Sequence, residues 1–255
     1  MKLAIMQPYF FPYLGYFQGI CAVDKYILYD NLAYIKEGWV NRNRYLVTRG
    51  TPMYFIAPIK GKSSFAKIKD VELVEERSWR QKLLKSIVVN YKRRPFFEDI
   101  YPLVERVVNA DVALLTDLCS LSVRTICDYL DITTEMATDR TKFLELEVKL
   151  SANEADLQQL FPSMHLNRFE RKVIRAIAMC HIEKAEVFVN AIGGRCLYDK
   201  EEFKNNNIDL FFIYTYPYSY PQSTPDFYPD LSIIDVLMNC GKEGTRRLLR
   251  QYQLI

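Results

Sequence analysis

Histidine is scarce in this chain, and the common catalytic patterns are missing with it. His165 and His181 are the only two histidines in 255 residues. His181 follows an apolar helical stretch, where a positive group at a helix C-terminus is a simpler interpretation than catalysis. The sequence has no Walker loop, no H-E-x-x-H zinc motif, no EF-hand and no Ser-His-Asp order. A general base must therefore be sought among the carboxylates.

Long apolar runs are missing as well. No stretch approaches the ~18 apolar residues that cross a bilayer. The apolar start behind Lys2 is broken by Gln7 and Pro8, which is unlike a secretory signal. The six cysteines are scattered and form no C-x-x-C pair, so neither a zinc site nor a thioredoxin-type centre is indicated. We expect a cytoplasmic protein with reduced thiols, no structural metal and no membrane insertion.

Charge of one sign does not dominate, whereas aromatic residues are abundant. The net charge is +3, which does not suggest the dense basic stripe of a nucleic-acid binder. Basic residues do cluster in Lys92-Arg93-Arg94 and Arg246-Arg247, so RNA binding stays as an alternative, although nucleic acid is not the expected partner. Eighteen tyrosines and fifteen phenylalanines suit either a large aromatic core or a cleft for sugars, bases and other flat ligands.

Apolar periodicity predicts alternating strands and helices. Residues 1–30 read as a strand, a short crossover over 13–23 and a second, parallel strand. Strands are then predicted at 44–47, 53–57, 68–74, 130–136, 187–189 and 210–214, and helices at 78–91, 97–109, 111–130, 170–181, 199–204 and 231–241. Residues 138–165 are ambiguous. The pattern favours an α/β, Rossmann-like domain over 1–255, with a mainly parallel sheet and a helical insertion over 76–130.

The first strand runs into a proline-rich aromatic loop, residues 7–17. A strand, this loop and a helix are similar to the H-x-G-H loop of nucleotidyltransferases and class I synthetases, where two histidines contact ATP. Here Tyr13 and Tyr16 hold those positions, and Gly15 permits a close approach of the backbone. Tyrosine can bond phosphate but carries no positive charge. ATP and a nucleotidyltransferase-like variant of the fold therefore stay open, the alternative being a tight turn fixed by the two prolines.

The polar cluster that follows Trp39 is a candidate anion site. On a strand, Asn41 and Asn43 face one side, and Arg42 and Arg44 the other. An arginine fork binds phosphate or carboxylate, so we expect at least one of the two to bind a diphosphate. Lys60 and Lys62 could complete the site, or they could simply be solvated.

Further polar groups stand at strand exits and before the last helix. Asn190 ends a strand and precedes Gly193-Gly194, which could form an anion-binding nest or a plain turn. Gln222 lies in a loop over 216–229 that could cover the site. Asp30 follows a buried strand and is the preferred base. Asp235, behind the N-cap Ser232, is either catalytic or a residue that complements the helix dipole.

Together these residues form one predicted site. The catalytic candidates are Asp30 and Asp235, and the substrate- or nucleotide-binding candidates are Gln7, Pro8, Tyr9, Tyr13, Gly15, Tyr34, Trp39, Asn41, Arg42, Asn43, Arg44, Lys60, Asn190, Gly193, Gly194 and Gln222. Because clefts outside the carboxyl ends of parallel strands bind ligands in open α/β sheets, we expect the site at that edge.

Four segments carry a resemblance to a known family. They are QPYFFPYLGYF at 7–17, WVNRNR at 39–44, NAIGGRCLY at 190–198, and the stretch from Gln222 through FYPDLSIIDVLMN at 227–239. This combination resembles the WbqC-like proteins of bacteria over nearly the whole chain, with 138–160 atypical.

The resemblance implies a role in the biosynthesis of O-antigen and related surface polysaccharides. It implies transfer of an aminoacyl group, such as glycyl, or an acyl group from a small-molecule donor to the amine of a nucleotide-activated amino sugar. The alternative is a non-catalytic protein that binds a sugar nucleotide or acts as a scaffold. Two features favour that alternative: the loop over 7–17 has tyrosines in place of the two phosphate-binding histidines, and the chain has few histidines.

Overall fold

A mostly parallel sheet forms the centre of the protein. The computed structural model describes residues 1–48, 50–61, 66–137 and 141–255. Within them, six strands pair in the order β5-β2-β1-β6-β7-β8. Their bounds are β1 Lys2–Met6, β2 Lys25–Leu28, β5 Glu135–Ala137, β6 Val187–Ala191, β7 Asp209–Thr215 and β8 Tyr252–Leu254. All neighbours are parallel except β7 and β8. The predicted α/β class with a Rossmann-like, mainly parallel sheet is confirmed.

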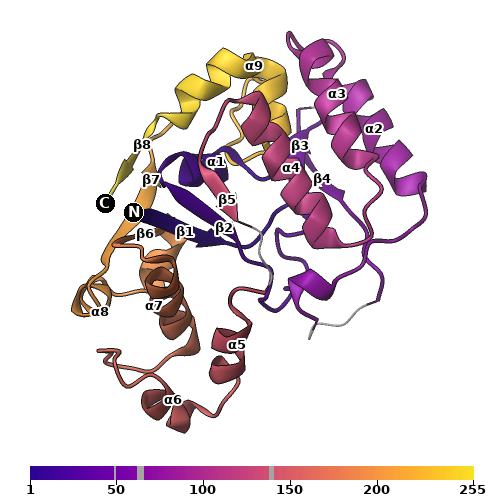
Figure 1. The fold of residues 1–255 in the computed structure, drawn as a ribbon. Helices are drawn as coiled ribbons and strands as arrows, with labels where there is room; N and C mark the ends of the chain where they lie inside the picture. Colours follow the sequence, from indigo (N-terminus) through magenta and orange to yellow (C-terminus); the bar gives the residue numbers. More distant parts are fainter. Residues whose placement is uncertain (49, 62–65, 138–140) are drawn as a thin grey trace.

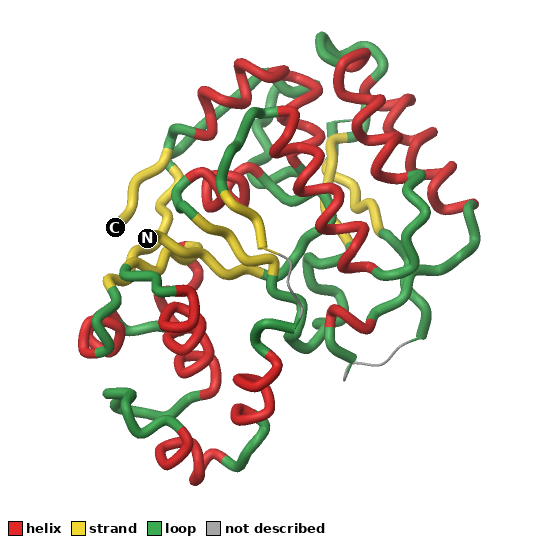
Figure 2. Tube along the Cα trace, in the orientation of Figure 1, coloured by secondary structure: helices red, strands yellow, loops and turns green. Residues whose placement is uncertain are grey.

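Helices cover both faces of this sheet (Figures 1 and 2). In Figure 1, one side carries α1 (Leu14–Cys21), α4 (Leu115–Tyr129) and α9 (Ile233–Leu249), with α2 (Ser78–Tyr91) and α3 (Phe97–Val108) outside them. The other side carries α5 (Leu144–Leu150), α6 (Glu154–Leu160), α7 (Arg171–Glu183) and α8 (Lys200–Asn205). A separate antiparallel hairpin, β3 (Arg42–Leu46) and β4 (Pro52–Ile56), lies beside the first group.

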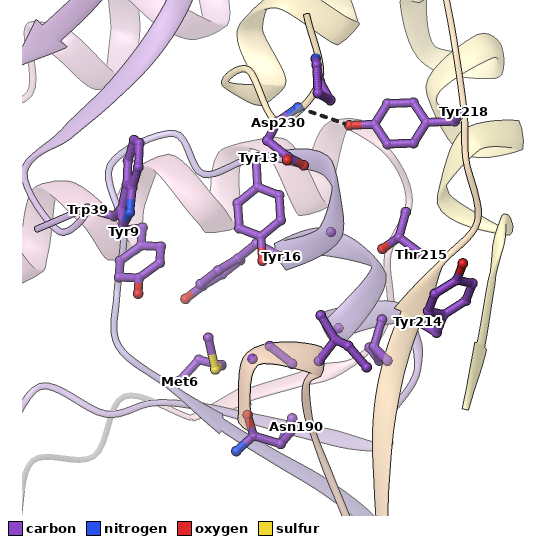
Figure 3. A pocket seen from close by; sticks show the side chains of 18 of the residues that line it. Met6, Tyr9, Tyr13, Tyr16, Trp39, Asn190, Tyr214, Thr215, Tyr218 and Asp230 are labelled. Carbon is purple, nitrogen blue, oxygen red and sulfur yellow. Dashed lines mark hydrogen bonds between the residues drawn. The ribbon is translucent and has the colours of Figure 1, made fainter. Parts of the chain in front are cut away.

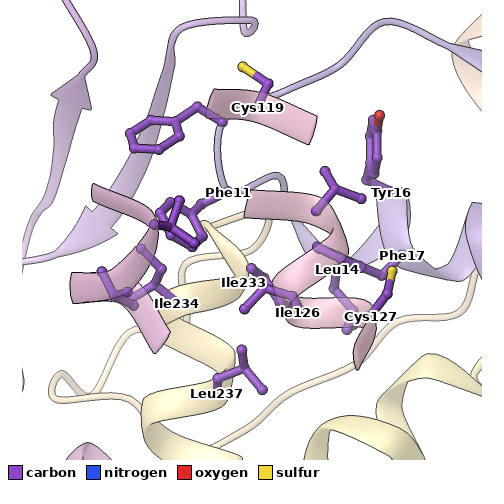
Figure 4. Close-up of a cluster of buried hydrophobic side chains, with 14 of the residues drawn as sticks. Phe11, Leu14, Tyr16, Phe17, Cys119, Ile126, Cys127, Ile233, Ile234 and Leu237 are labelled. Carbon is purple, nitrogen blue, oxygen red and sulfur yellow. The ribbon is translucent and has the colours of Figure 1, made fainter. Parts of the chain in front are cut away.

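The alternation of side chains along each strand separates two hydrophobic cores. Ala4 and Tyr26 pack on the α1 side, whereas their neighbours Leu3 and Ile27 pack on the α7 side. Figure 4 shows where α1, α4 and α9 meet around Phe11. The aromatic loop is therefore anchored in the larger core, because its Phe11 side chain is fully buried.

Several boundaries differ from the sequence-based expectation. The predicted strand at 68–74 is wrong. Residues Ile68–Asp70 form a 3-10 helix, and residues 72 and 73 make only isolated bridges to Leu114 and Ile59. Single bridges replace a ladder because the partners are short loop segments. The strand expected at 130–136 is limited to β5, and α9 continues past a kink at Gly241 (φ 62°). The segments α5, α6 and β8 had no assignment from sequence.

The strand order creates a switch point at β1. From β1 the chain crosses to β2 on one side, whereas β6 pairs on the other side. Ligands of open α/β sheets bind outside the carboxyl ends of the strands at such a point. The fold therefore places the expected ligand site between the ends of β1 and β6.

Candidate functional site

A large cavity occupies this position. Its volume is about 860 Å³, and it opens along α1 at the ends of β1, β6 and β7 (Figure 3). We call it the aromatic pocket, because its lining includes Tyr9, Tyr13, Tyr16, Tyr26, Trp39, Tyr214, Tyr216, Tyr218 and Phe227. Cavities of several hundred Å³ with apolar walls and a few polar groups are typical ligand sites.

The loop before α1 brings the first wall of the pocket into place. The Phe11 carbonyl accepts hydrogen bonds from Asn43 Nδ2 and from Ser232 Oγ, each at 2.8 Å, which ties the loop to β3 and to the start of α9. A Cβ on Gly15 would lie 2.6 Å from Cε2 of Tyr13, so only glycine lets that ring lie across the helix start.

Two tyrosines of this wall remain neutral hydrogen-bonding groups. Burial raises the pKa of Tyr13 to about 12. Burial also raises the pKa of Tyr16, whose hydroxyl donates to the Gln7 carbonyl at 2.8 Å. Gln7 therefore supports the wall through its backbone, and Gln7 and Pro8 do not line the pocket. Since neither tyrosine is charged at neutral pH, these positions offer a phosphate no cation.

Asn41, directly before β3, and Asn43, within it, face the interior, on the side opposite the two arginines. Asn41 and Asn43 are buried. Asn41 accepts from the Tyr34 hydroxyl at 2.8 Å and donates to the Ala57 carbonyl at 3.0 Å. Asn41 and Tyr34 therefore hold the hairpin together and lie outside the lining of the aromatic pocket, whereas Asn43 lines it.

The two arginines on the other face differ in their surroundings. Arg42 donates from Nε to the Gly38 carbonyl at 3.0 Å, bonds the Glu37 carbonyl, and lies over the Tyr54 ring. Arg44 lines the aromatic pocket, with its guanidinium carbon 5.6 Å from the Trp39 ring centroid. Its Nε is buried and has no hydrogen-bond partner among the described residues. A buried donor normally has a partner, so Arg44 has the capacity to bind a ligand acceptor.

The segment 216–230, which we call the covering loop, forms another wall. Gln222 closes it upon itself, because its side-chain amide donates to the Tyr228 carbonyl at 2.9 Å and accepts from the Tyr228 N–H at 2.8 Å. Gln222 thus shapes the loop and does not line the pocket. Tyr218 and Phe227 present their rings to the pocket.

Asp230, at the end of the covering loop, lines the pocket and had no assigned role from sequence. Its backbone has φ 56°, a conformation that non-glycine residues rarely adopt and that clusters at functional sites. Its N–H lies 3.5 Å from the Tyr218 hydroxyl (Figure 3). Its carboxylate makes no hydrogen bond or ion pair within the described part of the chain. The available signal was a carboxylate in the family-like stretch FYPD at 227–230, directly before the last helix.

Asp235 lies in the protein interior, outside the pocket lining. It is only 1% exposed and accepts from the hydroxyls of Tyr91 at 2.5 Å and Tyr220 at 2.8 Å. Burial raises the pKa of this carboxyl, and the two tyrosine hydrogen bonds oppose that shift. Both oxygens are therefore committed to tying α2 and the covering loop to α9.

Asp30 and Lys60 also lie away from the aromatic pocket. Asp30 accepts from the Thr116 hydroxyl at 2.8 Å in a smaller cleft of about 350 Å³ between the end of β2 and α4. Lys60 forms ion pairs with Glu72 and Glu75. Lys62 lies outside the described residues.

The end of β6 contributes an amide, Asn190, and a glycine, Gly193, to the pocket. Asn190 and Gly193 line the pocket, whereas Gly194 does not. A Cβ on Gly194 would lie 2.9 Å from Oδ1 of Asn190, so this glycine allows the asparagine to stay in place. Residues Ile192–Cys196 form a 3-10 helix here.

The fold thus brings part of the predicted set together. Eight candidates line the aromatic pocket: Tyr9, Tyr13, Gly15, Trp39, Asn43, Arg44, Asn190 and Gly193. Among the described residues of the lining, the charged side chains are Arg44 and Asp230. In the ranges that the structure describes, no group of three or more His, Cys, Asp or Glu side chains could hold a metal ion, and no helix has both the length and the apolar character to span a membrane.

Comparison with known proteins gives one family. The model of the WbqC-like protein family matches residues 7–247. An uncharacterized protein of Mycobacterium tuberculosis is 27% identical over 249 residues, which cover 95% of this chain and 95% of that protein. No solved structure matches the chain.

Proposed function

The chain belongs to the WbqC-like protein family, and on that premise we propose that it acts in the biosynthesis of bacterial surface polysaccharide such as O-antigen. The proposed reaction transfers an aminoacyl group, for example glycyl, or an acyl group to the amine of a nucleotide-activated amino sugar. The observation that carries the proposal is Arg44, which lines the aromatic pocket at the switch point of the sheet and whose buried Nε has no hydrogen-bond partner among the described residues.

The pocket supplies the groups that such a substrate needs. Arg44 would hold the diphosphate, because guanidinium groups bind phosphate through parallel N–H bonds. Trp39 and the tyrosine rings would contact the flat faces of the base and sugar. Asn190 and Thr215 would give the sugar hydroxyls hydrogen-bond partners.

Asp230 is the proposed base, in place of Asp30. The amine nitrogen would attack the acyl carbon of an activated donor and form a C–N bond. The bond between that carbon and its leaving group would break, and the amine proton would pass to the Asp230 carboxylate. Asp30 lies in the other cleft and Asp235 has both oxygens engaged.

ATP fits this site less well than a nucleotide sugar does. The positions that match the histidines of nucleotidyltransferases are Tyr13 and Tyr16, which are neutral, so the helix start has no side-chain cation for a triphosphate. No step of the proposal therefore uses ATP.

Titration of the protein with UDP, dTDP and their amino sugars tests the proposal. We expect the nucleotide sugars to bind and to raise Tm. Arg44→Gln should weaken binding by about 1.5 to 3 kcal/mol, the worth of hydrogen bonds to a charged group.

Arg42→Gln is the matched control, because Arg42 lies on the same strand and outside the pocket lining. It should bind ligand as the wild type does. Equal losses in both variants, or no binding of any nucleotide sugar, would contradict the proposed site.

A second candidate function is binding of the sugar nucleotide without catalysis. It is favoured by one observation: the lining includes one carboxylate, Asp230, and neither histidine nor cysteine among the described residues. Tight binding of nucleotide amino sugars with no product from a panel of aminoacyl and acyl donors would support this candidate over the transferase.

A further inference from the structure

Helix α2 and the turn after it concentrate the positive charge of the chain. Residues 77–94 contain seven lysines and arginines and no acidic residue. The whole chain has a net charge of only +3, so the remainder is net negative. The nearest acidic residues in the sequence flank this segment: Glu75, Glu76, Glu98 and Asp99. A charge asymmetry of this kind indicates an anionic partner.

Four of the five exposed charges of this segment form one stripe, which we call the α2 stripe. The buried face of α2 consists of Leu83, Leu84, Ile87 and Tyr91. The opposite face exposes Lys82, Lys85 and Val89, and the exposed Lys92 and Arg93 follow in the turn directly after the helix. At 100° per residue the three helical positions span a sector of about 60°, and Lys92 and Arg93 extend the stripe beyond the end of the helix.

The stripe is held in a fixed orientation. The Tyr91 hydroxyl accepts from the Leu46 N–H at 3.0 Å and donates to Asp235, which fixes the rotation of the helix. Figure 1 shows α2 at the outer edge of the molecule. In the described part of the chain, the four cations of the stripe form no ion pair. They can therefore bind an anionic partner without first breaking an ion pair.

We propose that the α2 stripe docks the protein on an anionic lipid membrane surface. Clusters of four to eight lysines and arginines on a helix bind anionic headgroups. The cations lie on α2 and the turn after it, at the outer edge of the molecule, where a membrane plane can reach them. Val89, which is 60% exposed at the centre of the stripe, would enter the headgroup boundary.

A membrane fits this stripe better than nucleic acid does. Single-stranded nucleic acid is bound by exposed aromatic rings that stack on its bases. The α2 stripe contains no aromatic residue, and an exposed valine adds nothing to phosphate contacts. The inference is independent of the proposed function, since the stripe shares no residue with the aromatic pocket.

Vesicle flotation tests the proposal with the full-length protein. Vesicles of pure phosphatidylcholine are compared with vesicles that contain about one third phosphatidylglycerol, at low and high salt. We expect binding to the anionic vesicles only, and its loss at high salt. Lys82→Gln/Lys85→Gln should reduce partitioning about 25-fold, at roughly fivefold per charge.

Two controls make the result specific. Lys200→Gln/Lys204→Gln removes the same charge from exposed lysines of α8 and should bind vesicles as the wild type does. Val89→Ser should weaken vesicle binding and leave binding to a single-stranded RNA oligonucleotide unchanged. Equal binding to neutral vesicles, equal losses in the two lysine pairs, or tighter binding to the RNA than to anionic vesicles would overturn the proposal.

Discussion

Asp230 and Asp235 stand five residues apart at the start of α9, and both lie among tyrosines, yet their surroundings are opposite. Asp235 is buried and accepts from two tyrosine hydroxyls. Asp230 faces the aromatic pocket, and its carboxylate has no hydrogen-bond or ion-pair partner in the described part of the chain. The residue type is the same, so it is access to the pocket that separates them.

This difference suggests a chemical role for Asp230 and a structural role for Asp235. A carboxylate that is buried outside the pocket, with both oxygens occupied by tyrosine hydroxyls, stabilises what it binds and does not contact a ligand. A carboxylate that is unengaged in a cavity can bind an amine or receive its proton. We therefore expect substitutions at Asp230 to change function, and those at Asp235 to change stability first.

The largest expected effect is on turnover in Asp230→Asn. Loss of the base should lower the rate of acyl transfer by about 100- to 10,000-fold. Asparagine tolerates the positive φ of this position, so the free energy of unfolding should change by less than about 0.5 kcal/mol. Single-turnover assays and urea unfolding measure the two quantities. Wild-type turnover in this variant would remove Asp230 from the chemistry.

Asp235→Asn should have the reverse profile. An amide nitrogen cannot accept a hydrogen bond, so one tyrosine hydroxyl loses its partner in the interior. The free energy of unfolding should fall by about 2 to 3 kcal/mol. Urea unfolding of Asp230→Asn and Asp235→Asn side by side gives the direct comparison. The distinction between the two aspartates fails if both variants are equally stable.

Tyr220→Phe and Tyr91→Phe compare the two tyrosine hydroxyls that donate to Asp235. Each removes one donor to Asp235, but the Tyr91 hydroxyl also accepts from the Leu46 N–H. Tyr91→Phe should therefore cost about 2 kcal/mol and Tyr220→Phe about 1 kcal/mol of stability. Only Tyr220 belongs to the covering loop, so only Tyr220→Phe should also weaken nucleotide-sugar binding. Calorimetric titration of both variants with a nucleotide sugar measures the two affinities. Equal affinities would mean that the Tyr220–Asp235 hydrogen bond does not influence ligand binding.

The smallest expected effect is on the pH dependence of stability. Burial raises the pKa of Asp235 in the folded protein, so the native state binds this proton more tightly than the unfolded chain does. The contribution of this proton to stability is complete below the unfolded pKa of about 3.9 and is lost as pH rises through the raised value. Wild type should therefore lose stability relative to Asp235→Asn as pH rises above the unfolded pKa and through the raised one. A constant difference over that range, measured by urea unfolding, would contradict it.

Much of the local structure followed from the sequence. Short apolar runs predicted β1, β2, β6 and β7, and apolar positions at helical spacing predicted α2 and α7. Ser232 was predicted as an N-cap, and its hydroxyl accepts from the Ile234 N–H. The separation of Asn41 and Asn43 from Arg42 and Arg44 also followed, because side chains alternate along a strand whatever surrounds it.

The choice between Arg42 and Arg44 did not follow. Both have the same chemistry and lie on the same face of β3. Arg42 bonds the Gly38 carbonyl, because the preceding loop turns back over it, whereas Arg44 reaches the pocket. The path of that loop depends on packing against the rest of the hairpin, which no local pattern encodes.

The sequence by itself determined the alternating strands and helices, the parallel first unit and the polar residues at the strand exits, since these depend on local periodicity and turn chemistry. Only the tertiary structure decided which exits share a cavity. β2 pairs on the opposite side of β1 from β6, so Asp30 meets α4 while Asn190 meets the aromatic pocket. The covering loop then adds Asp230 to that pocket, although Asp230 follows β1 by more than two hundred residues in the sequence. Strand order and loop docking are set by contacts distant in sequence, and for that reason they appear only in the folded protein.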